Sequence, residues 1–199
     1  MANILNDGVM VGETKMAVRE LLSARAIQER ITSLGAEIAA HYAGLGSIHT
    51  VTVLNGALHF ASALRLAVAA ANETLAQHTS SDTVHLASYH GTDSSGKVEK
   101  ISDLTHSVEG KHVLVLEDII DTGRTLSVLI AELKEQKPAS FAIAALLRKP
   151  EKLAVPAENL GPDVYVGFDI GPEFVVGYGL DYEGLYRDLS AIYALSPSE

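Results

Sequence analysis

The sequence predicts an α/β fold, in which helices flank a mostly parallel, twisted sheet. Short apolar runs alternate along the chain with stretches whose apolar residues recur at helical spacing. The run Val113–Leu116 is entirely apolar, which is typical of a strand buried on both faces of a parallel sheet. No repeat and no obvious linker divides the 199 residues, so we expect a single domain over 1–199.

The expected elements follow one another in a regular order. A first long helix is expected between Ser23 and Ala43, with Ser23 as its N-cap. Another helix begins near Leu126 and ends before Pro138, because the residue preceding a proline disfavours helical backbone. The remaining expectations are strands at 50–54, 84–89, 113–116 and 141–147, a helix at 57–71, and a polar, glycine-containing loop at 91–111.

The C-terminal segment has a different pattern. Val164, Val166 and Phe168 alternate with Tyr165 and Gly167, glycines recur after them, and no long helical pattern follows. We therefore expect a small irregular cap at about 161–199, together with part of the N-terminus, above a core at about 20–160. Open α/β sheets bind ligands at the carboxyl ends of their strands, so the cap should lie over that edge.

Composition excludes several classes of protein. Of the residues, 47% are hydrophobic and 20% charged, which is typical of a globular protein with a sizeable core. The absence of cysteine excludes disulfides and thiolate metal sites and suits a cytoplasmic protein. The formal net charge of −10 argues against binding nucleic acid. We expect no membrane association, because the most apolar stretch, 57–71, is short and interrupted by His59 and Arg65, and the first residues do not resemble a secretory signal.

The segment Val113–Thr125 carries the clearest chemical signal. Its apolar strand is followed by two adjacent acids, Glu117 and Asp118, and then by the turn Asp121–Thr125 that leads into a helix. A helix start offers unpaired amides and the positive end of the helix dipole, which together bind phosphate. The acids would accept hydrogen bonds from sugar hydroxyls or lie near a cation. The alternative is that Asp121, Thr122 and Gly123 form only a turn and a helix cap.

This segment closely resembles the phosphoribosyl pyrophosphate (PRPP) signature of type I phosphoribosyltransferases. The resemblance implies that Glu117 and Asp118 hold the ribose hydroxyls. It implies that the 5′-phosphate is bound by Thr122, Gly123, Arg124 and Thr125.

Three further segments resemble hypoxanthine-guanine phosphoribosyltransferases, so the resemblance extends over about 50–189. They are Leu146–Pro150, Phe174–Tyr182 with Tyr186–Leu189, and Ser88–Tyr89, which resembles the start of a flexible active-site loop. The resemblance implies a purine site of Lys149, Phe174 and Val175, a pyrophosphate site of Asn55, Gly56 and Arg187, and a Mg²⁺ site at Asp181, with Glu117 and Asp118 as further candidate ligands.

Each of these residues also has an ordinary structural interpretation. Lys149 would otherwise be an exposed lysine after a strand, Phe174 a core aromatic, and Asp181 a turn cap. Arg187 would pair with a surface acid. The sequence departs from the family at Asn55, where a lysine or arginine is usual, and at Glu173, which is acidic where a basic or other polar residue is common.

The expected reaction is transfer of the phosphoribosyl group from PRPP to a 6-oxopurine, hypoxanthine or guanine, in purine salvage. Asp121 is the candidate general base, taking the proton from purine N7, and Mg²⁺ is the implied cofactor. Partners would be PRPP, the purine, pyrophosphate and further copies of the chain in a homodimer or homotetramer. Three alternatives remain: a transferase for xanthine or another base, another sugar-phosphate enzyme, or a regulator that senses PRPP or nucleotide.

Overall fold

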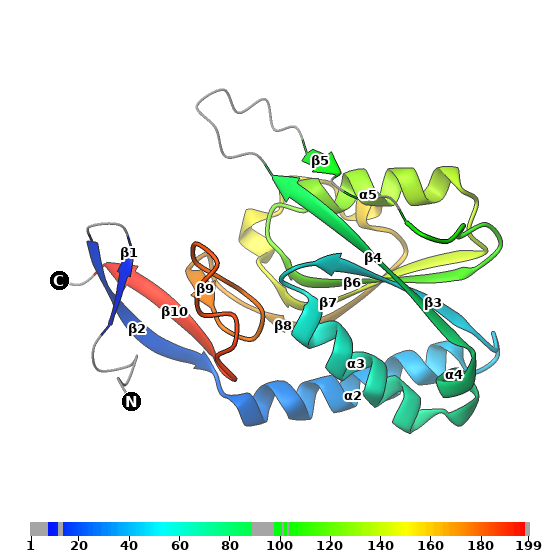
Figure 1. The fold of residues 1–199 in the computed structure, drawn as a ribbon, viewed down its shortest axis with the longest axis horizontal. Helices are drawn as coiled ribbons and strands as arrows, with labels where there is room; N and C mark the ends of the chain where they lie inside the picture. Colours follow the sequence, from blue (N-terminus) through cyan, green and yellow to red (C-terminus); the bar gives the residue numbers. More distant parts are fainter. Residues whose placement is uncertain (1–7, 12–13, 89–97, 101, 103, 198–199) are drawn as a thin grey trace.

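The computed structural model describes residues 8–11, 14–88, 98–100, 102 and 104–197, which form two sheets (Figure 1). The large sheet has the order β5-β4-β3-β6-β7-β8. Its parallel strands are β3 (Ile48–Leu54), β4 (Thr79–Ser88), β6 (His112–Ile120), β7 (Ser140–Arg148) and β8 (Asp163–Asp169), and β5 (Val98–Lys100) joins antiparallel to β4. The predicted α/β class with a mostly parallel sheet is confirmed.

The direction of the chain reverses at the centre of this sheet. From β3 the chain moves outward to β4, whereas from β6 it moves the other way to β7 and β8. The connections that leave the carboxyl ends of β3 and β6 therefore run in opposite directions and leave a crevice, which is where doubly wound sheets bind ligands.

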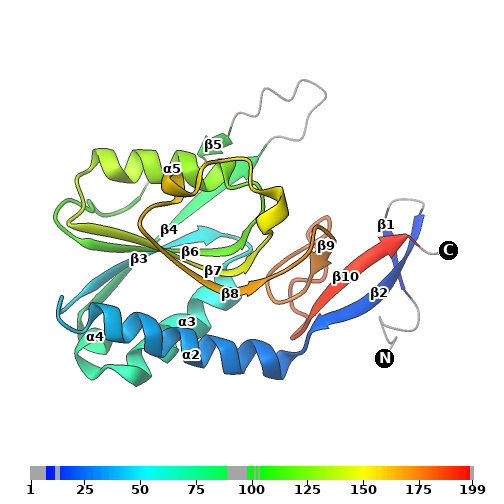
Figure 2. The same cartoon turned by 180° about the vertical axis from the view of Figure 1, so that it is seen from behind.

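Helices cover both faces of the large sheet. Figures 1 and 2 show α2 (Ala24–Tyr42) and α3 (Leu58–Ala71) on one face and α5 (Arg124–Glu135) on the other. The short α4 (Glu73–His78) connects α3 to β4, and the 3₁₀ turns η1 (Pro150–Lys152) and η2 (Ala157–Leu160) follow β7. In the part of the chain that the structure describes, no helix has the length and apolarity needed to cross a bilayer.

The α2 helix has the boundary and the buried face that its periodicity predicts. Ser23 Oγ accepts a hydrogen bond from the amide of Ala26 at 3.2 Å, as an N-cap does. The apolar side chains at helical spacing are fully buried and pack with α3 and the sheet: Ile27, Ile31, Leu34 and Ile38.

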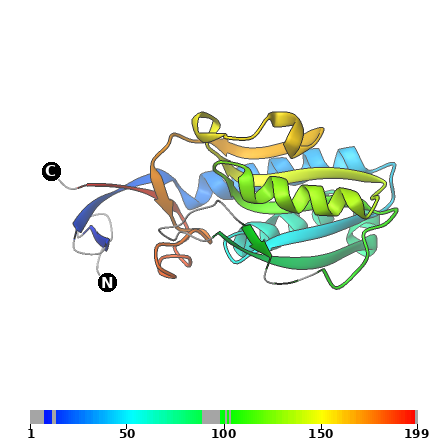
Figure 3. The same cartoon turned by 90° about the horizontal axis from the view of Figure 1, so that it is seen from above.

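The second sheet joins the two ends of the chain. It has the order β1-β2-β10-β9, and consists of β1 (Val9–Val11), β2 (Thr14–Leu22), β10 (Ile192–Pro197) and β9 (Phe174–Val176), all antiparallel. This cap lies at one end of the molecule, beyond the strand ends of the large sheet (Figure 3). The strand Asp163–Asp169, which we expected in the cap, instead pairs with β7 as the edge strand of the large sheet and contacts α2.

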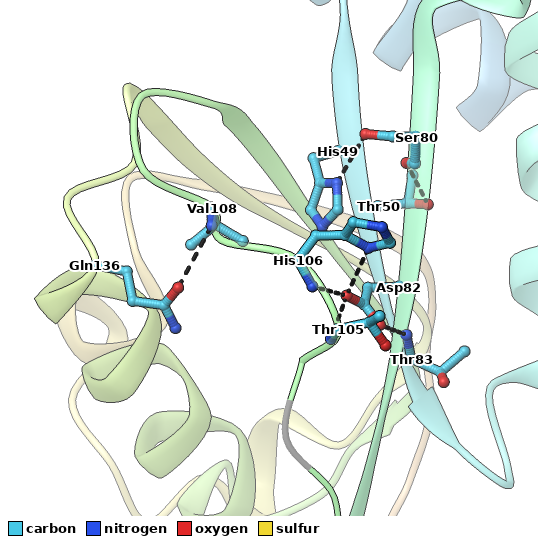
Figure 4. A network of polar contacts seen from close by, with 9 residues as sticks. All are labelled: His49, Thr50, Ser80, Asp82, Thr83, Thr105, His106, Val108 and Gln136. Atoms are coloured by element: carbon cyan, nitrogen blue, oxygen red, sulfur yellow. Dashed lines mark hydrogen bonds and ion pairs between the residues drawn. The ribbon is translucent and has the colours of Figure 1, made fainter.

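The β4 and β6 strands extend furthest beyond their predicted bounds, and each includes a buried acid, Asp82 or Glu117. The β6 strand continues through Glu117 and Asp118 to Ile120, and β4 begins at Thr79. Towards the amino ends of β3 and β4, His49 bonds to Ser80, and Asp82 accepts the amides of Thr105 and His106 (Figure 4). Such bonds satisfy polar groups inside a sheet, where a sequence pattern predicts none.

Candidate active site

A cavity of about 430 Å³ opens at the point where the chain direction reverses. It lies between the carboxyl ends of β3 and β6, the start of α5 and the C-terminal segment. Its lining includes the predicted general base Asp121 and the predicted metal ligand Asp181. It also includes most residues predicted for ribose, phosphate and pyrophosphate: Asn55, Gly56, Glu117, Asp118, Thr122, Gly123, Thr125 and Arg187.

The start of α5 has the geometry that a phosphate site requires. Gly123 is the N-cap and has φ of 76°, a left-handed conformation that favours glycine. A Cβ at this position would also lie 2.6 Å from a methyl carbon of Val155. A hydrogen bond from Ala154 N to Thr122 O at 3.0 Å holds the turn before the helix, and Thr122, Gly123 and Thr125 line the cavity.

Two carboxylates form the floor of the cavity at the end of β6. Glu117 is only 9% exposed, and burial, followed by the charge of Asp118, raises its pKa well above the usual value. Asp118 Oδ1 accepts the amide of Ile119 at 2.7 Å. A buried acid beside a second acid is stabilised by a cation or by hydroxyl donors, which this pair would meet in a metal-bound sugar phosphate.

A second cavity of about 300 Å³ adjoins the first. Both are lined by Asp118, Ile119, Asp121 and Asp181, so the two spaces meet there. The remaining walls of the second cavity include the predicted purine residues: Lys149, Phe174 and Val175.

Two of the residues predicted to bind the purine have surroundings that their ordinary structural interpretations do not predict. Lys149 is buried, at 4% exposure, and its Nζ lies 3.2 Å from Asp121 Oδ2. Phe174 is 49% exposed instead of lying in the core, and its ring meets that of Tyr182 edge-on at 5.9 Å. An exposed aromatic face at a cavity wall is available to stack on a flat ligand.

The C-terminal segment packs directly on the loop after β3. Gly179 lies so close to Gly56 that a Cβ on it would collide with the Gly56 carbonyl oxygen. Arg187 donates to the carbonyl of Gly179 at 2.6 Å and pairs with Asp181 Oδ1 at 2.7 Å. The Leu54–Asn55 peptide at this contact is cis.

Both carboxylate oxygens of Asp181, the predicted metal ligand, already have partners within the protein. Its Oδ1 pairs with Arg187, and its Oδ2 accepts the amide of Gly184 at 2.7 Å. No group of three or more histidines, aspartates or glutamates converges on metal-binding geometry within the described ranges. Mg²⁺ is commonly held by one or two carboxylates together with substrate phosphates, and Glu117, Asp118 and Asp181 fit that partial donor set.

The structure brings together the predicted residues with few exceptions. Arg124 lines neither cavity. For the predicted flexible loop, Tyr89 lies outside the described residues, and only the backbone of Ser88, at the end of β4, is described.

Sequence reasoning missed one charged residue of the second cavity, Lys152, along with Pro172, and it missed His85 and Leu86 of the first. The spacing of Lys149 and Lys152 around Pro150 was the available signal, because a short turn after a strand brings residues three apart to the same side.

Comparisons with known proteins agree with this geometry. A model of the phosphoribosyl transferase domain matches residues 17–183. The chain is 40% identical over 184 residues to the hypoxanthine-guanine phosphoribosyltransferase of Mycobacterium avium. The alignment covers 89% of this chain and 85% of that protein. It is 40% identical over 178 residues to the enzyme of the same name from Staphylococcus aureus, covering 89% and 93%. A solved hypoxanthine phosphoribosyl transferase of Trypanosoma cruzi matches with a TM-score of 0.80 at 34% identity, covering 89% of this chain and 91% of that one.

Proposed function

Because the chain belongs to the phosphoribosyl transferase domain family and is a phosphoribosyltransferase, we propose that it transfers the phosphoribosyl group of PRPP to a 6-oxopurine, hypoxanthine or guanine or both. The products are the nucleoside 5′-monophosphate and pyrophosphate, and the physiological role is purine salvage. The 40% identity to hypoxanthine-guanine phosphoribosyltransferases over most of the chain supports this choice of base.

The observation that carries the proposal is the junction of the two cavities at Asp121. One cavity has a helix start, buried acids and Arg187, which suit a ribose bearing phosphate and pyrophosphate. The other has a buried ammonium and an exposed aromatic ring, which suit a flat base with a carbonyl. A bond between sugar and base would form where the two spaces meet, and Asp121 lines both.

In binding, each group of the substrates meets a complementary part of the protein. The α5 start and Thr122 and Thr125 take the 5′-phosphate, and Glu117 and Asp118 accept from the ribose hydroxyls. Lys149 donates to the six-position oxygen of the purine, and the Phe174 ring stacks on its face. Adenine has an amino group at that position and would leave the Lys149 ammonium unmatched.

In the chemical step, the purine N9 forms a bond to C1′ of the ribose as the bond from C1′ to pyrophosphate breaks. The electron pair of that bond leaves with pyrophosphate, and the ribose passes through oxocarbenium character. Asp121 accepts the proton from purine N7, so that the ring does not carry the positive charge of attack. Mg²⁺, when bound, offsets charge on the pyrophosphate, and Glu117, Asp118 and Asp181 are the residues that would hold it.

The experiment that tests this proposal is a panel of bases offered to the purified protein with PRPP and Mg²⁺. Hypoxanthine, guanine, xanthine, adenine and uracil are compared by the nucleotide and the pyrophosphate formed. We expect turnover with hypoxanthine or guanine, and little with adenine or uracil. Turnover with xanthine alone would identify another specificity, and binding of PRPP without turnover of any base would identify a sensor.

A further inference from the structure

Lys152 contacts the same carboxylate oxygen as Lys149. Asp121 Oδ2 lies 3.2 Å from Lys149 Nζ and 3.5 Å from Lys152 Nζ. The other oxygen, Asp121 Oδ1, is buried and has no hydrogen-bond partner among the described residues. Two ammonium groups therefore hold one oxygen of the proposed general base.

We propose that Lys152 is a positioning residue, which keeps the Asp121 carboxylate in place while Lys149 binds the purine. This inference rests on the proposed function, because it assigns a role within that reaction. Lys152 does not touch the reacting atoms and acts only through Asp121.

The local backbone brings both lysines to Asp121. The turn η1, which begins at Pro150, closes with a hydrogen bond from Lys152 N to Lys149 O at 3.0 Å. In a 3₁₀ turn, side chains three residues apart project in the same direction. The turn is fastened to β6 because Lys149 N donates to Ile120 O at 2.9 Å. The two ammonium groups thus approach Asp121 from the same side.

The two lysines differ in burial, and this difference suits two roles. The Lys149 side chain is 5% exposed within the purine cavity, whereas that of Lys152 is 41% exposed. When Lys149 donates to the purine oxygen, its donors are divided between the base and Asp121. Lys152, which pairs with Asp121 among the described residues, still holds Oδ2. The Asp121 carboxylate then keeps its position beside the purine.

The test is a double-mutant cycle between Lys152→Met and Asp121→Asn, with hypoxanthine and PRPP as substrates. We expect Lys152→Met to lower kcat about three- to tenfold, the range for a partly exposed charged hydrogen bond, with the KM for PRPP unchanged. Lys152→Arg should recover most of the loss. In the Asp121→Asn background, Lys152→Met should cause no further loss, because the carboxylate it positions is gone.

Controls separate this role from a general effect on the turn or on charge. Glu151→Gln changes a charge in the same turn, and Lys134→Met removes a distant exposed lysine; neither should lower kcat.

The possible outcomes distinguish the two proposals. Equal loss from Lys152→Met in both backgrounds would overturn the positioning role and leave the proposed function intact. Loss with xanthine but not with hypoxanthine would assign Lys152 to the base itself and also overturn that role. An unaltered protein that forms no nucleotide with any base would overturn the proposed function, and the positioning role with it.

Discussion

At the scale of single residues, the proposed role of Asp121 as general base predicts a large loss of kcat when its carboxylate is replaced. Asp121→Asn preserves size and one oxygen, but the amide cannot accept the purine proton. We expect kcat to fall about 10²- to 10⁴-fold, the usual contribution of a positioned general base, with binding of PRPP nearly unchanged. Steady-state kinetics and equilibrium titration with PRPP measure the two quantities. Asp163→Asn, at the start of β8, is the matched control, and full turnover in Asp121→Asn would remove Asp121 from this role.

Glu117 lowers the stability of the ligand-free fold, because its carboxylate is buried. Burial and the neighbouring Asp118 raise its pKa, so the folded state is penalised for ionising it. This penalty is absent below the unfolded-state pKa and complete above the folded-state pKa. Glu117→Gln should therefore increase the free energy of unfolding of the ligand-free protein at neutral pH by about 0.5–2 kcal/mol. Below the unfolded-state pKa the gain should vanish, because the glutamate is then uncharged in both states.

The measurement for Glu117→Gln is thermal unfolding across pH without ligands, combined with a titration of PRPP. Binding should weaken as stability increases, because the amide replaces a charged acceptor of the ribose hydroxyls. Glu135→Gln, on the exposed face of α5, should change neither quantity. An unchanged affinity for PRPP would contradict the role of Glu117 at the ribose.

At the scale of elements, the polar network around Asp82 ties the chain after β5 to β4. Asp82 is 6% exposed and accepts the amides of Thr83, Thr105 and His106 at 2.9, 2.7 and 2.9 Å (Figure 4). Burial would raise the pKa of Asp82, but the hydrogen bonds from His106, Thr83 and Thr105 outweigh it and lower the pKa below its usual value. The carboxylate therefore stabilises the fold above its unfolded-state pKa, and this contribution is lost as pH falls through the folded-state pKa.

Asp82→Asn should therefore destabilise the protein by about 1–3 kcal/mol at neutral pH, the cost of breaking a buried, charged hydrogen-bond network. The deficit relative to the unaltered protein should shrink as pH falls below the ordinary range of an aspartate. Urea unfolding at a series of pH values measures it. A deficit that stays constant down to the lowest pH would show that the network does not depend on the charge of Asp82.

Elements differ in how far the sequence predicts them. The strand, turn and helix of Val113–Thr125 are contiguous, so local pattern alone predicted the strand end and helix start that line the first cavity. The pairing of β2 with β10 joins segments at opposite ends of the chain, and no local pattern encodes it. The start of β4 was missed because Ser80, Ser81 and Asp82 read as polar, although partners in the fold satisfy Ser80 and Asp82. Lys152 was missed because its contact with Asp121 depends on how η1 folds against β6.

At the scale of the whole molecule, charge opposes the proposed substrate. The formal net charge is −10, and the cavity proposed for PRPP is lined by Glu117, Asp118, Asp121 and Asp181. Among the described residues that line it, Arg187 is the one lysine or arginine. An anionic sugar phosphate would meet repulsion both at a distance and inside the site. Simple salt screens charges in solvent beyond about 8 Å at physiological ionic strength but acts weakly on buried groups. A divalent cation inside the site acts where salt does not.

Removal of divalent cations should therefore abolish nucleotide formation, and monovalent salt should not restore it. The comparison uses EDTA-treated protein in KCl and in MgCl₂ at equal ionic strength, with hypoxanthine and PRPP. We expect turnover only with MgCl₂, and tighter binding of PRPP in its presence, because Mg²⁺ places positive charge between the pyrophosphate and the carboxylates. Equal turnover in the two salts would mean that Arg187 and the α5 amides suffice to hold the anion, and that the buried acids serve the ribose alone.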